Sequence, residues 1–355
     1  MQILDVTVRD GSYAVDFKFS RFEVRDIVSK LVKLGLEYIE IGHGMGLNAS
    51  SPEHGISLRT DEEYITAAKE VSGDAKLGMF CIPGIARFED LAMAANRGLS
   101  FIRIGVPVKS VGEALPYIKE ARKYGLEVMV NFMKSYANTP QEFADSAKTV
   151  SDAGVEAVYL VDSAGCMLPA DIKAFYDTVK GICPDLKIGF HGHNNMGLAV
   201  SNSLYCAEIG FDYIDTSFQG LGRSIGNAST EMFVMAYQKS MKDKGADKWT
   251  DMDIPRLLEY GYASLKDVMG DKIIHPLDLI CGYTGFHSGF LKQIHRCCSD
   301  HNVDPLRLIM AYSAENQLTL DYDRLCEIAK ELPTDDFDEH PYNFRQFFSA
   351  VFNDR

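Results

Sequence analysis

The sequence predicts an α/β fold, a (β/α)8 TIM barrel followed by a small all-α C-terminal region. Three observations support this prediction. The chain has 355 residues, enough for one large barrel with an appendage. A helix-like segment, a glycine and an apolar run recur through the first two thirds, and only helix-period segments follow after about residue 250. A doubly wound open sheet is the alternative, but the even period and the number of strands favour the barrel.

A regular series of glycines divides the first two thirds of the chain into elements. Successive glycines lie 38, 25, 27, 29, 27 and 29 residues apart. Glycine is the expected residue just past a helix, because it adopts a positive φ without a Cβ clash. The series consists of Gly35, Gly73, Gly98, Gly125, Gly154, Gly181 and Gly210.

An apolar run follows each of these glycines, and the opening run at residues 2–8 completes a set of eight predicted strands. The runs are rich in Ile, Val, Phe and Tyr, as expected for strands that are covered on both faces. After the opening run they read LGLEYIEIG, GDAKLGMFCI, GLSFIRIGV, GLEVMVNF, GVEAVYLVD, GICPDLKIGFHGH and GFDYIDTSF. Eight such units over about 240 residues match a barrel, in which chemistry lies just after each strand.

The longest interval between glycines predicts a loop at this catalytic rim. It holds HGMGLNASSPEHGISLR, residues 43–59, directly after the second strand. A long loop rich in Gly, Ser and Asn is typical of a rim loop or a lid. His43 opens this loop, and we expect it to bind substrate.

Three regions follow from these patterns. Residues 1–250 are predicted to form the catalytic barrel, residues 255–330 a helical appendage and residues 331–355 a divergent tail. In the tail, apolar residues recur at helical spacing, which favours a docked helix over a free end. These residues are Phe344, Phe347, Phe348, Val351 and Phe352.

Composition excludes several classes of protein. Hydrophobic residues at 46% and charged residues at 24% are ordinary for a globular chain. The net charge of −14 argues against nucleic-acid and anionic-membrane partners, since such a surface repels both. The sequence shows neither a signal peptide nor a membrane-spanning apolar run, so we expect a cytoplasmic protein. The eight cysteines form no C-x-x-C pair and are interpreted as buried, reduced thiols.

The strongest candidate for chemistry is the run GFHGHNN at the end of the seventh strand. Residues i and i+2 share a strand face, so His191 and His193 should point together into the barrel mouth. This pattern is common among metal ligands, although two structural histidines would produce the same spacing. A carboxylate would complete such a site. We place Asp10 at the C-terminal end of the first strand, near the seventh strand in a closed barrel.

Other rim residues suggest roles around that metal. Arg9 offers a fixed cation for developing negative charge, although Arg9 and Asp10 alone would suggest a surface ion pair. Ser163, after the sixth strand, is either a contact for a substrate carboxylate or a helix N-cap. The run GLGRSIGNASTE follows the eighth strand. Its Asn227 is a candidate oxygen ligand, whereas a phosphate cradle there has only weak support.

Several of these motifs, in this order, resemble one superfamily. The RDG turn after the first strand, HGHNN on the seventh and GN-x-x-x-E after the eighth are similar to those of the metal-dependent aldolase and lyase barrels that include HMG-CoA lyase. Within this superfamily the chain most resembles the 4-hydroxy-2-oxovalerate aldolases, over about residues 3–330. The matching segments are HGMGLNASSPEHG, IPGIARFEDL, VYLVDSAGCML, HGHNNMGLAVSNS and GYTGFHSGFL.

This resemblance implies a metal and a set of site residues. A divalent ion, Mn²⁺ or Mg²⁺, would be held by Asp10, His191 and His193, with Asn227 matching a ligand of the lyase branch. The residue at Arg9 would stabilise a pyruvate enolate. The resemblance also implies that Ser163 helps to seat the 2-oxo acid. An acylating aldehyde dehydrogenase is the implied partner, through the helical appendage, although the tail diverges from that pattern. We also expect a homo-oligomer.

The predicted reaction is retro-aldol cleavage of a 4-hydroxy-2-oxo acid to pyruvate and an aldehyde, or the reverse aldol addition. The metal would chelate the 2-oxo and carboxylate oxygens of the substrate. Breaking the C3–C4 bond then leaves an enolate, whose charge the metal and Arg9 would absorb. One alternative is a Claisen-type lyase or synthase that acts on an acyl-CoA ester. Another is a catalytically degraded barrel that serves as a binding subunit, against which the intact ligand set argues.

The chain departs from the aldolases at two positions that face the substrate in that family. Tyr13 stands where they carry a histidine base, and His287 stands where they carry a tyrosine. A phenol titrates near pH ~10 and an imidazole near ~6.5. We therefore predict that His287 is the base and that Tyr13 orients the same hydroxyl. The alternative is a changed substrate for which neither residue moves a proton, with His43 as the next candidate base.

Overall fold

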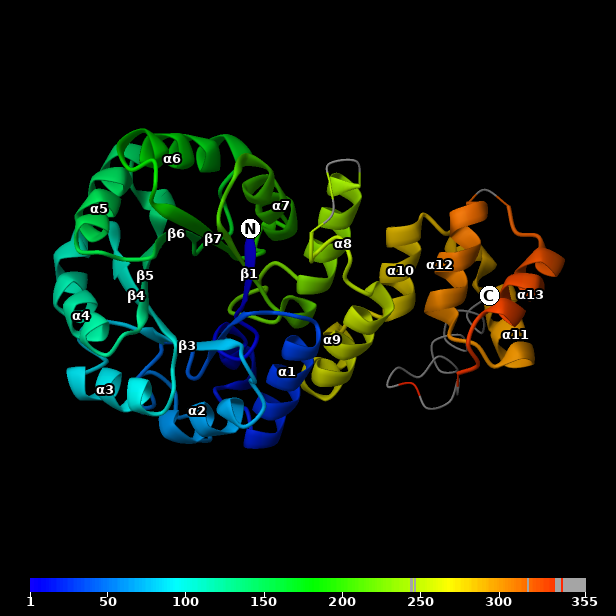
Figure 1. Cartoon of the computed structure of the whole chain (residues 1–355), viewed down its shortest axis with the longest axis horizontal. Helices are drawn as coiled ribbons and strands as arrows, with labels where there is room; N and C mark the ends of the chain where they lie inside the picture. The colour runs from blue at the N-terminus through cyan, green and yellow to red at the C-terminus, as the bar shows by residue number, and fades with distance from the viewer. Residues whose placement is uncertain (243–244, 246, 318, 336–339, 341–355) are drawn as a thin grey trace. The chain divides into compact units, whose positions relative to one another are not determined.

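Eight parallel strands close into a barrel in the computed structural model of the chain (Figure 1). Each strand pairs with its neighbours in sequence, and β1 pairs with β8 to close the ring. The predicted (β/α)8 TIM barrel is confirmed, and a strand forms in each predicted run. The strands are β1 (Gln2–Asp5), β2 (Tyr38–Ile41), β3 (Lys76–Cys81), β4 (Phe101–Pro107), β5 (Glu127–Met133), β6 (Ala157–Asp162), β7 (Lys187–Gly192) and β8 (Tyr213–Thr216).

The structure describes residues 1–355 apart from 243–244, 246, 318, 336–339 and 341–355. The chain forms two compact units, Met1–Phe233 and Val234–Arg355. This division falls inside α8 (Thr230–Met241), whereas the sequence suggests a barrel that ends near residue 250. That boundary stays a prediction.

Helices alternate with the strands and surround the barrel (Figure 1). The expected glycine stop is clear at Gly210, which follows α7 with φ of 105° and donates its N–H to Cys206 O. Only glycine adopts this backbone conformation without strain. The helices are α1 (Arg21–Lys33), α2 (Asp61–Lys69), α3 (Phe88–Asn96), α4 (Val111–Lys123), α5 (Pro140–Asp152), α6 (Pro169–Ile182) and α7 (Ala199–Ile209).

The first strand is shorter than predicted, which corrects the position of Asp10. β1 ends at Asp5, and Asp10 begins a short 3-10 helix, η1 (Asp10–Val15). The chain turns here because the N–H groups of Asp10 and Gly11 both donate to Val6 O, at 2.9 and 3.4 Å. Asp10 therefore lies in a tight turn beyond the strand, not at its end.

The barrel interior has an apolar floor and a polar layer. The floor includes Tyr38, Phe101, Met129 and Tyr213, all buried. Side chains two positions apart lie on the same face of a strand. The residues two positions after the floor residues therefore also point into the barrel, and they form a second layer closer to the C-terminal ends of the strands. On the same four strands these are Glu40, Arg103, Asn131 and Asp215, which are also buried. The polar layer thus lies on the side of the floor where the strands end.

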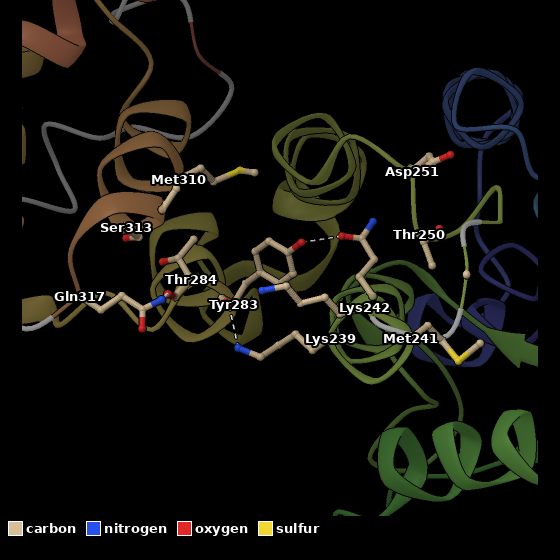
Figure 2. A pocket seen from close by; sticks show the side chains of 13 residues that line it. Lys239, Met241, Lys242, Thr250, Asp251, Tyr283, Thr284, Met310, Ser313 and Gln317 are labelled. Atoms are coloured by element: carbon tan, nitrogen blue, oxygen red, sulfur yellow. Dashed lines mark hydrogen bonds between the residues drawn. The ribbon is translucent and has the colours of Figure 1, made fainter.

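The second unit is helical, as predicted for the appendage. Its helices begin with side-chain caps on Asp253, Asp304 and Asp321, and proline occupies the first turn of α9 and α12. The helices are α9 (Ile254–Met269), α10 (Pro276–Thr284), α11 (Leu291–His301), α12 (Pro305–Glu315) and α13 (Tyr322–Glu331). A cavity of about 620 Å³ lies within this unit, lined by Lys239, Tyr283 and Gln317 among others. Figure 2 shows the side chains of these three residues.

Two further predictions concern the cysteines and the tail. All eight cysteines are free thiols, and six of them are buried. The predicted docked helix at residues 344–352 lies outside the described residues. Of the helices that the structure describes, none is both long enough and apolar enough to cross a membrane.

Candidate metal centre

Asp10, His191 and His193 converge at the C-terminal end of the barrel. Asp10 begins η1, His191 lies in β7 and His193 directly follows that strand. Each residue offers one potential ligand atom, and these three atoms all lie within 4.8 Å of one another. All three residues are buried. The strand order β7, β8, β1 brings them together, as closure of the barrel predicts.

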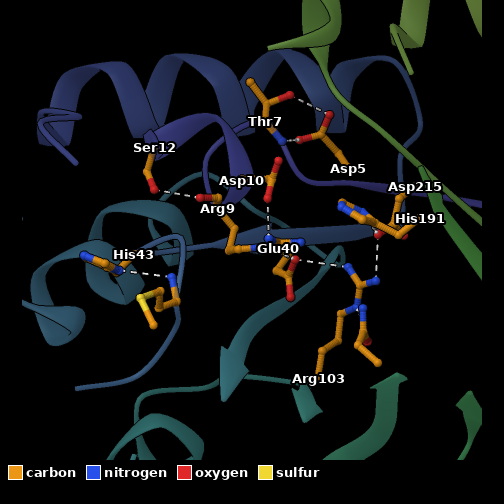
Figure 3. A network of polar contacts seen from close by, with 12 residues as sticks. Asp5, Thr7, Arg9, Asp10, Ser12, Glu40, His43, Arg103, His191 and Asp215 are labelled. Atoms are coloured by element: carbon orange, nitrogen blue, oxygen red, sulfur yellow. Dashed lines mark hydrogen bonds and ion pairs between the residues drawn. The ribbon is translucent and has the colours of Figure 1, made fainter. Parts of the chain in front are cut away.

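Asp215 holds the imidazole of His191 in one orientation. His191 Nδ1 lies 2.8 Å from Asp215 Oδ2. Because a carboxylate accepts the hydrogen bond, Nδ1 carries the proton and Nε2 keeps its lone pair for a cation. The same carboxylate oxygen accepts from Arg103 Nη2 at 2.6 Å, so a fully buried guanidinium anchors it (Figure 3).

Asp10 is held as an ionised carboxylate. Its Oδ1 accepts from Arg9 Nη1 at 2.6 Å and its Oδ2 from the Arg223 N–H at 3.1 Å. Burial alone would raise the pKa of Asp10, but the Arg9 guanidinium, together with the hydrogen bond from the Arg223 N–H, opposes this, and the pKa lies below its usual value. Asp10 is thus an anionic oxygen donor that faces two imidazoles.

His193 and Asn227 carry buried acceptor atoms that the protein leaves unpaired. A β-bridge joins the two residues. His193 Nδ1 and Asn227 Oδ1 are both buried, and neither has a hydrogen-bond partner among the described residues. Burial also lowers the pKa of His193 to about 4, which keeps the imidazole neutral and able to donate a lone pair. Unpaired buried acceptors beside a carboxylate are what a cation site requires.

The donor set and the local charge both fit a divalent cation. Two imidazoles, a carboxylate and an amide oxygen are ligands that Mn²⁺ accepts, and such a set leaves positions open for substrate. The buried network contains three carboxyl groups and two guanidinium groups, so it has an excess of negative charge. These groups are Asp10, Glu40, Asp215, Arg9 and Arg103.

Arg9 is fixed beside the cluster rather than exposed as a surface ion pair. Its Nε donates to Glu40 Oε2 at 2.6 Å, and its guanidinium carbon lies 4.9 Å from the centre of the Phe80 ring. The side chain of Arg9 is 6% exposed. The alternative that Arg9 and Asp10 form a surface ion pair is therefore wrong. A buried guanidinium that is already held in place can meet developing negative charge without reorganising.

Sequence reasoning missed Glu40, Arg103 and Asp215. Glu40 accepts from both guanidinium groups, at 2.6 Å from Arg9 Nε and 3.0 Å from Arg103 Nη1. Each of the three is the single charged residue within an apolar strand segment, YIEI, FIRI or YIDT. Because both faces of a barrel strand are covered, a charged residue in such a run must find a buried partner. That signal could have identified all three.

Tyr13 and His43 lie together around Phe17. The His43 ring stacks on Phe17 at 4.0 Å between centroids, and Tyr13 meets Phe17 edge-on at 5.2 Å. His43 Nδ1 accepts from the Met45 N–H at 3.0 Å, and His43 Nε2 lies 3.1 Å from Gly55 O. Both ring nitrogens therefore bond to the backbone of the predicted rim loop. The substrate-binding role of His43 stays a prediction.

Ser163 lies in the first unit of the chain and His287 in the second. Ser163 Oγ accepts from the Lys134 N–H at 3.0 Å, after β5, and the N-cap of α6 is Leu168. The helix-cap alternative for Ser163 is therefore wrong. His287 belongs to the second unit, where its Nδ1 accepts from the Gly289 N–H at 3.0 Å. Its role as base stays a prediction.

The loop after β8 is organised by Glu231, the last residue of GN-x-x-x-E. Its two carboxylate oxygens accept from the Gln219 N–H at 3.1 and 2.9 Å, and Ser229 Oγ donates to Oε2 at 2.8 Å. Burial raises the pKa of Glu231 to about 7. Asn227 Nδ2 donates to Leu221 O in the same loop, at 3.2 Å. These bonds hold Asn227 where it bridges to His193.

Known proteins resemble the chain in sequence and in fold. A family profile described as HMGL-like matches residues 1–258. A 4-hydroxy-2-oxovalerate aldolase of Carboxydothermus hydrogenoformans is 32% identical over 337 residues, covering 94% of this chain and 97% of that protein. An oxaloacetate decarboxylase of Mycobacterium tuberculosis is 37% identical over 290 residues, covering 81% and 83%. The HMG-CoA lyase of Brucella melitensis superposes with a TM-score of 0.62 at 20% identity, over 76% of this chain and 99% of that one.

Proposed function

Because the chain belongs to the HMGL-like family, we propose that it is a divalent-metal-dependent carbon–carbon lyase. It cleaves a 4-hydroxy-2-oxo acid to pyruvate and an aldehyde, or runs the reverse aldol addition. The observation that carries this proposal is the convergence of Asp10, His191 and His193 beside the buried guanidinium of Arg9. The relatives named 4-hydroxy-2-oxovalerate aldolase support the substrate class.

The metal would be held by Asp10, His191 and His193, with the amide oxygen of Asn227 as a further donor. Mn²⁺ or Mg²⁺ suits a set of carboxylate and imidazole donors. When bound, the ion supplies Lewis-acid polarisation of the 2-oxo group. The buried network has more carboxyl than guanidinium groups. The ion also adds positive charge to this network, and that added charge favours binding of an anionic substrate.

Arg9 stabilises the enolate that forms when the C3–C4 bond breaks. Its guanidinium is held by Glu40 and Asp10, at 2.6 Å each, so its orientation is set before substrate binds. Preorganised donors act most strongly where charge develops during the reaction, because they need no rearrangement. Ser163, half-buried after β6, is proposed to bind the substrate carboxylate through its hydroxyl.

A base must take the proton of the 4-hydroxyl group. We assign this step to His287, with Tyr13 orienting the hydroxyl, on the basis of the residue types at the two positions. Burial raises the pKa of Tyr13, although the Arg9 charge opposes this, so the phenol stays protonated near neutral pH and has no free base to offer. His43 is the less suitable candidate, because burial lowers its pKa and both of its nitrogens already bond to the backbone.

Oxaloacetate decarboxylation is a second candidate function. The relative named oxaloacetate decarboxylase is 37% identical to this chain. Loss of CO₂ from oxaloacetate produces the same pyruvate enolate, so Arg9 and the metal would serve both reactions in the same way. The two reactions differ in the second product, which is CO₂ in one case and an aldehyde in the other.

A substrate screen tests both functions. Purified, Mn²⁺-loaded enzyme is offered 4-hydroxy-2-oxo acids of increasing chain length and, separately, oxaloacetate. Release of pyruvate with a matching aldehyde supports the aldolase, and release of pyruvate with CO₂ supports the decarboxylase. A requirement for a CoA ester would instead support Claisen chemistry. Metal binding without turnover of any oxo acid would refute both proposals.

The proposal extends to location and assembly. We propose a cytoplasmic homo-oligomer, and an acylating aldehyde dehydrogenase as the consumer of the aldehyde. Sedimentation of the full chain, alone and mixed with such a dehydrogenase, measures both associations. A monomer that does not bind the dehydrogenase would limit the proposal to the catalytic barrel.

A further inference from the structure

Two cysteines and a histidine meet between two helices of the second unit. Cys297 and His301 lie four residues apart on α11, a spacing that puts both side chains on one face of the helix. Cys326 reaches them from α13. The Sγ atoms of the two cysteines are 3.8 Å apart, and an imidazole nitrogen of His301 completes a group whose ligand atoms all lie within 4.8 Å.

The geometry of the two sulfurs suits a shared ion better than a disulfide. A tetrahedral Zn²⁺ with Zn–S bonds of about 2.3 Å separates two thiolate sulfurs by about 3.8 Å. A disulfide requires about 2.05 Å, and the sulfurs here lie 3.8 Å apart. A disulfide would also leave the neighbouring imidazole of His301 without a role.

The electrostatics of the cluster also favour a cation. Cys297 is buried, whereas Cys326 and His301 are half-buried. Two thiolates with one Zn²⁺ would form a neutral unit, which removes the penalty of burying a single negative charge.

We propose that Cys297, His301 and Cys326 form a second metal site, which binds Zn²⁺ with water in the fourth position. Sulfur and imidazole ligands select Zn²⁺, whereas the oxygen and nitrogen donors of the barrel suit Mn²⁺ or Mg²⁺. The site joins α11 to α13, the last helix that the structure describes before the tail. Zn²⁺ bound there would cross-link these two helices, and its binding is independent of the lyase activity proposed for the barrel.

Cobalt substitution of the full chain distinguishes this site from the barrel centre. Co²⁺ bound to thiolates gives an intense charge-transfer band in the near ultraviolet, whereas Co²⁺ bound to the carboxylate and imidazoles of the barrel gives none. We expect the band in the wild-type protein and in His191→Ala, and its loss in Cys297→Ser and in Cys326→Ser. Cys298→Ser is the matched control, because Cys298 is an adjacent buried thiol of the same helix outside the cluster.

His301→Gln provides a variant that is expected to fold, since this side chain is only half-buried. Loss of one of three protein ligands should weaken Zn²⁺ binding about 100-fold or more, since loss of a residue that only orients a ligand already costs about 10- to 100-fold. Competition with a chromophoric chelator measures this affinity. The expected pyruvate-releasing activity of Cys326→Ser is that of the wild type.

Three results would overturn the proposal. The first is a wild-type protein that binds Co²⁺ without the thiolate band. The second is a band that survives in both cysteine variants. The third is a disulfide between Cys297 and Cys326 in protein purified without reductant, seen by mass spectrometry as a loss of the two thiol hydrogens. None of these outcomes depends on whether the barrel cleaves an oxo acid.

Discussion

The barrel buries five charged side chains in one connected network, whereas the second unit packs its helices mainly through apolar faces. Arg9, Asp10, Glu40, Arg103 and Asp215 are linked by contacts of 2.6 to 3.0 Å. Among the described residues of the second unit, Asp304 is the one buried charged side chain, and it caps α12.

The difference follows from how the two architectures direct side chains. Alternate residues of a barrel strand point to a common axis, so a charge on that face meets other side chains and no solvent. A helix residue can turn to the exposed face instead. A charged residue in an apolar strand is therefore a stronger indication of function than one in a helix. In the helical unit, the corresponding indication is a set of cysteines and a histidine on facing helices.

The largest expected effect comes from removing one ligand of the barrel centre. His191→Ala should lose bound Mn²⁺ and reduce turnover to background, while the barrel stays folded, because a residue at the rim contributes little to the core. Metal content by elemental analysis and the thermal unfolding midpoint measure the two effects. Chelation of the wild-type enzyme should likewise abolish turnover, and added Mn²⁺ should restore it. Full metal occupancy in His191→Ala would show that His191 is not a ligand of the metal.

The proposed base tests whether the second unit contributes to the chemistry of the barrel. His287→Ala should lower kcat about 10²- to 10⁴-fold, the usual range for a general base, and Tyr13→Phe should lower it less. The acidic limb of the pH–rate profile should disappear only in the His287 variant. His295→Ala, in the same unit, serves as the control. Near-normal turnover in His287→Ala would show that the base lies elsewhere.

Breaking the buried network should destabilise the barrel more than breaking an exposed pair destabilises the helices. Arg103→Met leaves Glu40 and Asp215 without their shared cation and should cost about 3–5 kcal/mol of unfolding free energy. Urea denaturation measures it. The control is Arg324→Met in α13, whose pairs with Glu315 and Glu327 are exposed and should not contribute measurably. Equal effects at the two positions would contradict the comparison.

Arg9→Lys separates charge from geometry at the enolate site. Lysine keeps the positive charge but cannot bridge Glu40 and Asp10 with a planar fork. We expect kcat to fall about 10²-fold with a smaller change in KM, because the enolate charge develops only during the reaction. Steady-state kinetics at saturating Mn²⁺ measure both constants. A change confined to KM would make Arg9 a substrate-binding residue only.

The smallest effect should come from Asp215→Asn, which tests a positioning residue. The amide can still hydrogen-bond to His191 but no longer balances the charge of Arg103. Loss of such a supporting contact typically weakens metal binding by about 10- to 100-fold. The Mn²⁺ dissociation constant of the folded variant is the readout, since a merely structural role would leave it unchanged. An unaltered constant would separate Asp215 from the metal centre.

The sequence by itself determined the order of the elements and much of the metal centre. The glycine spacing and the apolar runs are local signals, and they predict eight strands that the structure contains. The histidine pair on β7 is local as well, because the two-residue period of a strand is enough to align its side chains. The predicted position of Asp10 at the end of the first strand was wrong, because a turn that closes on Val6 O leaves no pattern in the apolar run.

Only the tertiary structure decided which residues surround those ligands. Arg103 and Asp215 are 112 positions apart in the chain. Closure of the barrel alone brings Arg103 Nη2 to 2.6 Å from Asp215 Oδ2. The same holds for Cys297 and Cys326, which no spacing motif connects and which two packed helices bring together. Sequence periodicity indicates the face of a strand or helix on which a side chain lies. It does not indicate which side chain the residue contacts across the barrel axis or between two helices. Those contacts are set by closure of the barrel and by helix packing, which involve residues far apart in the sequence.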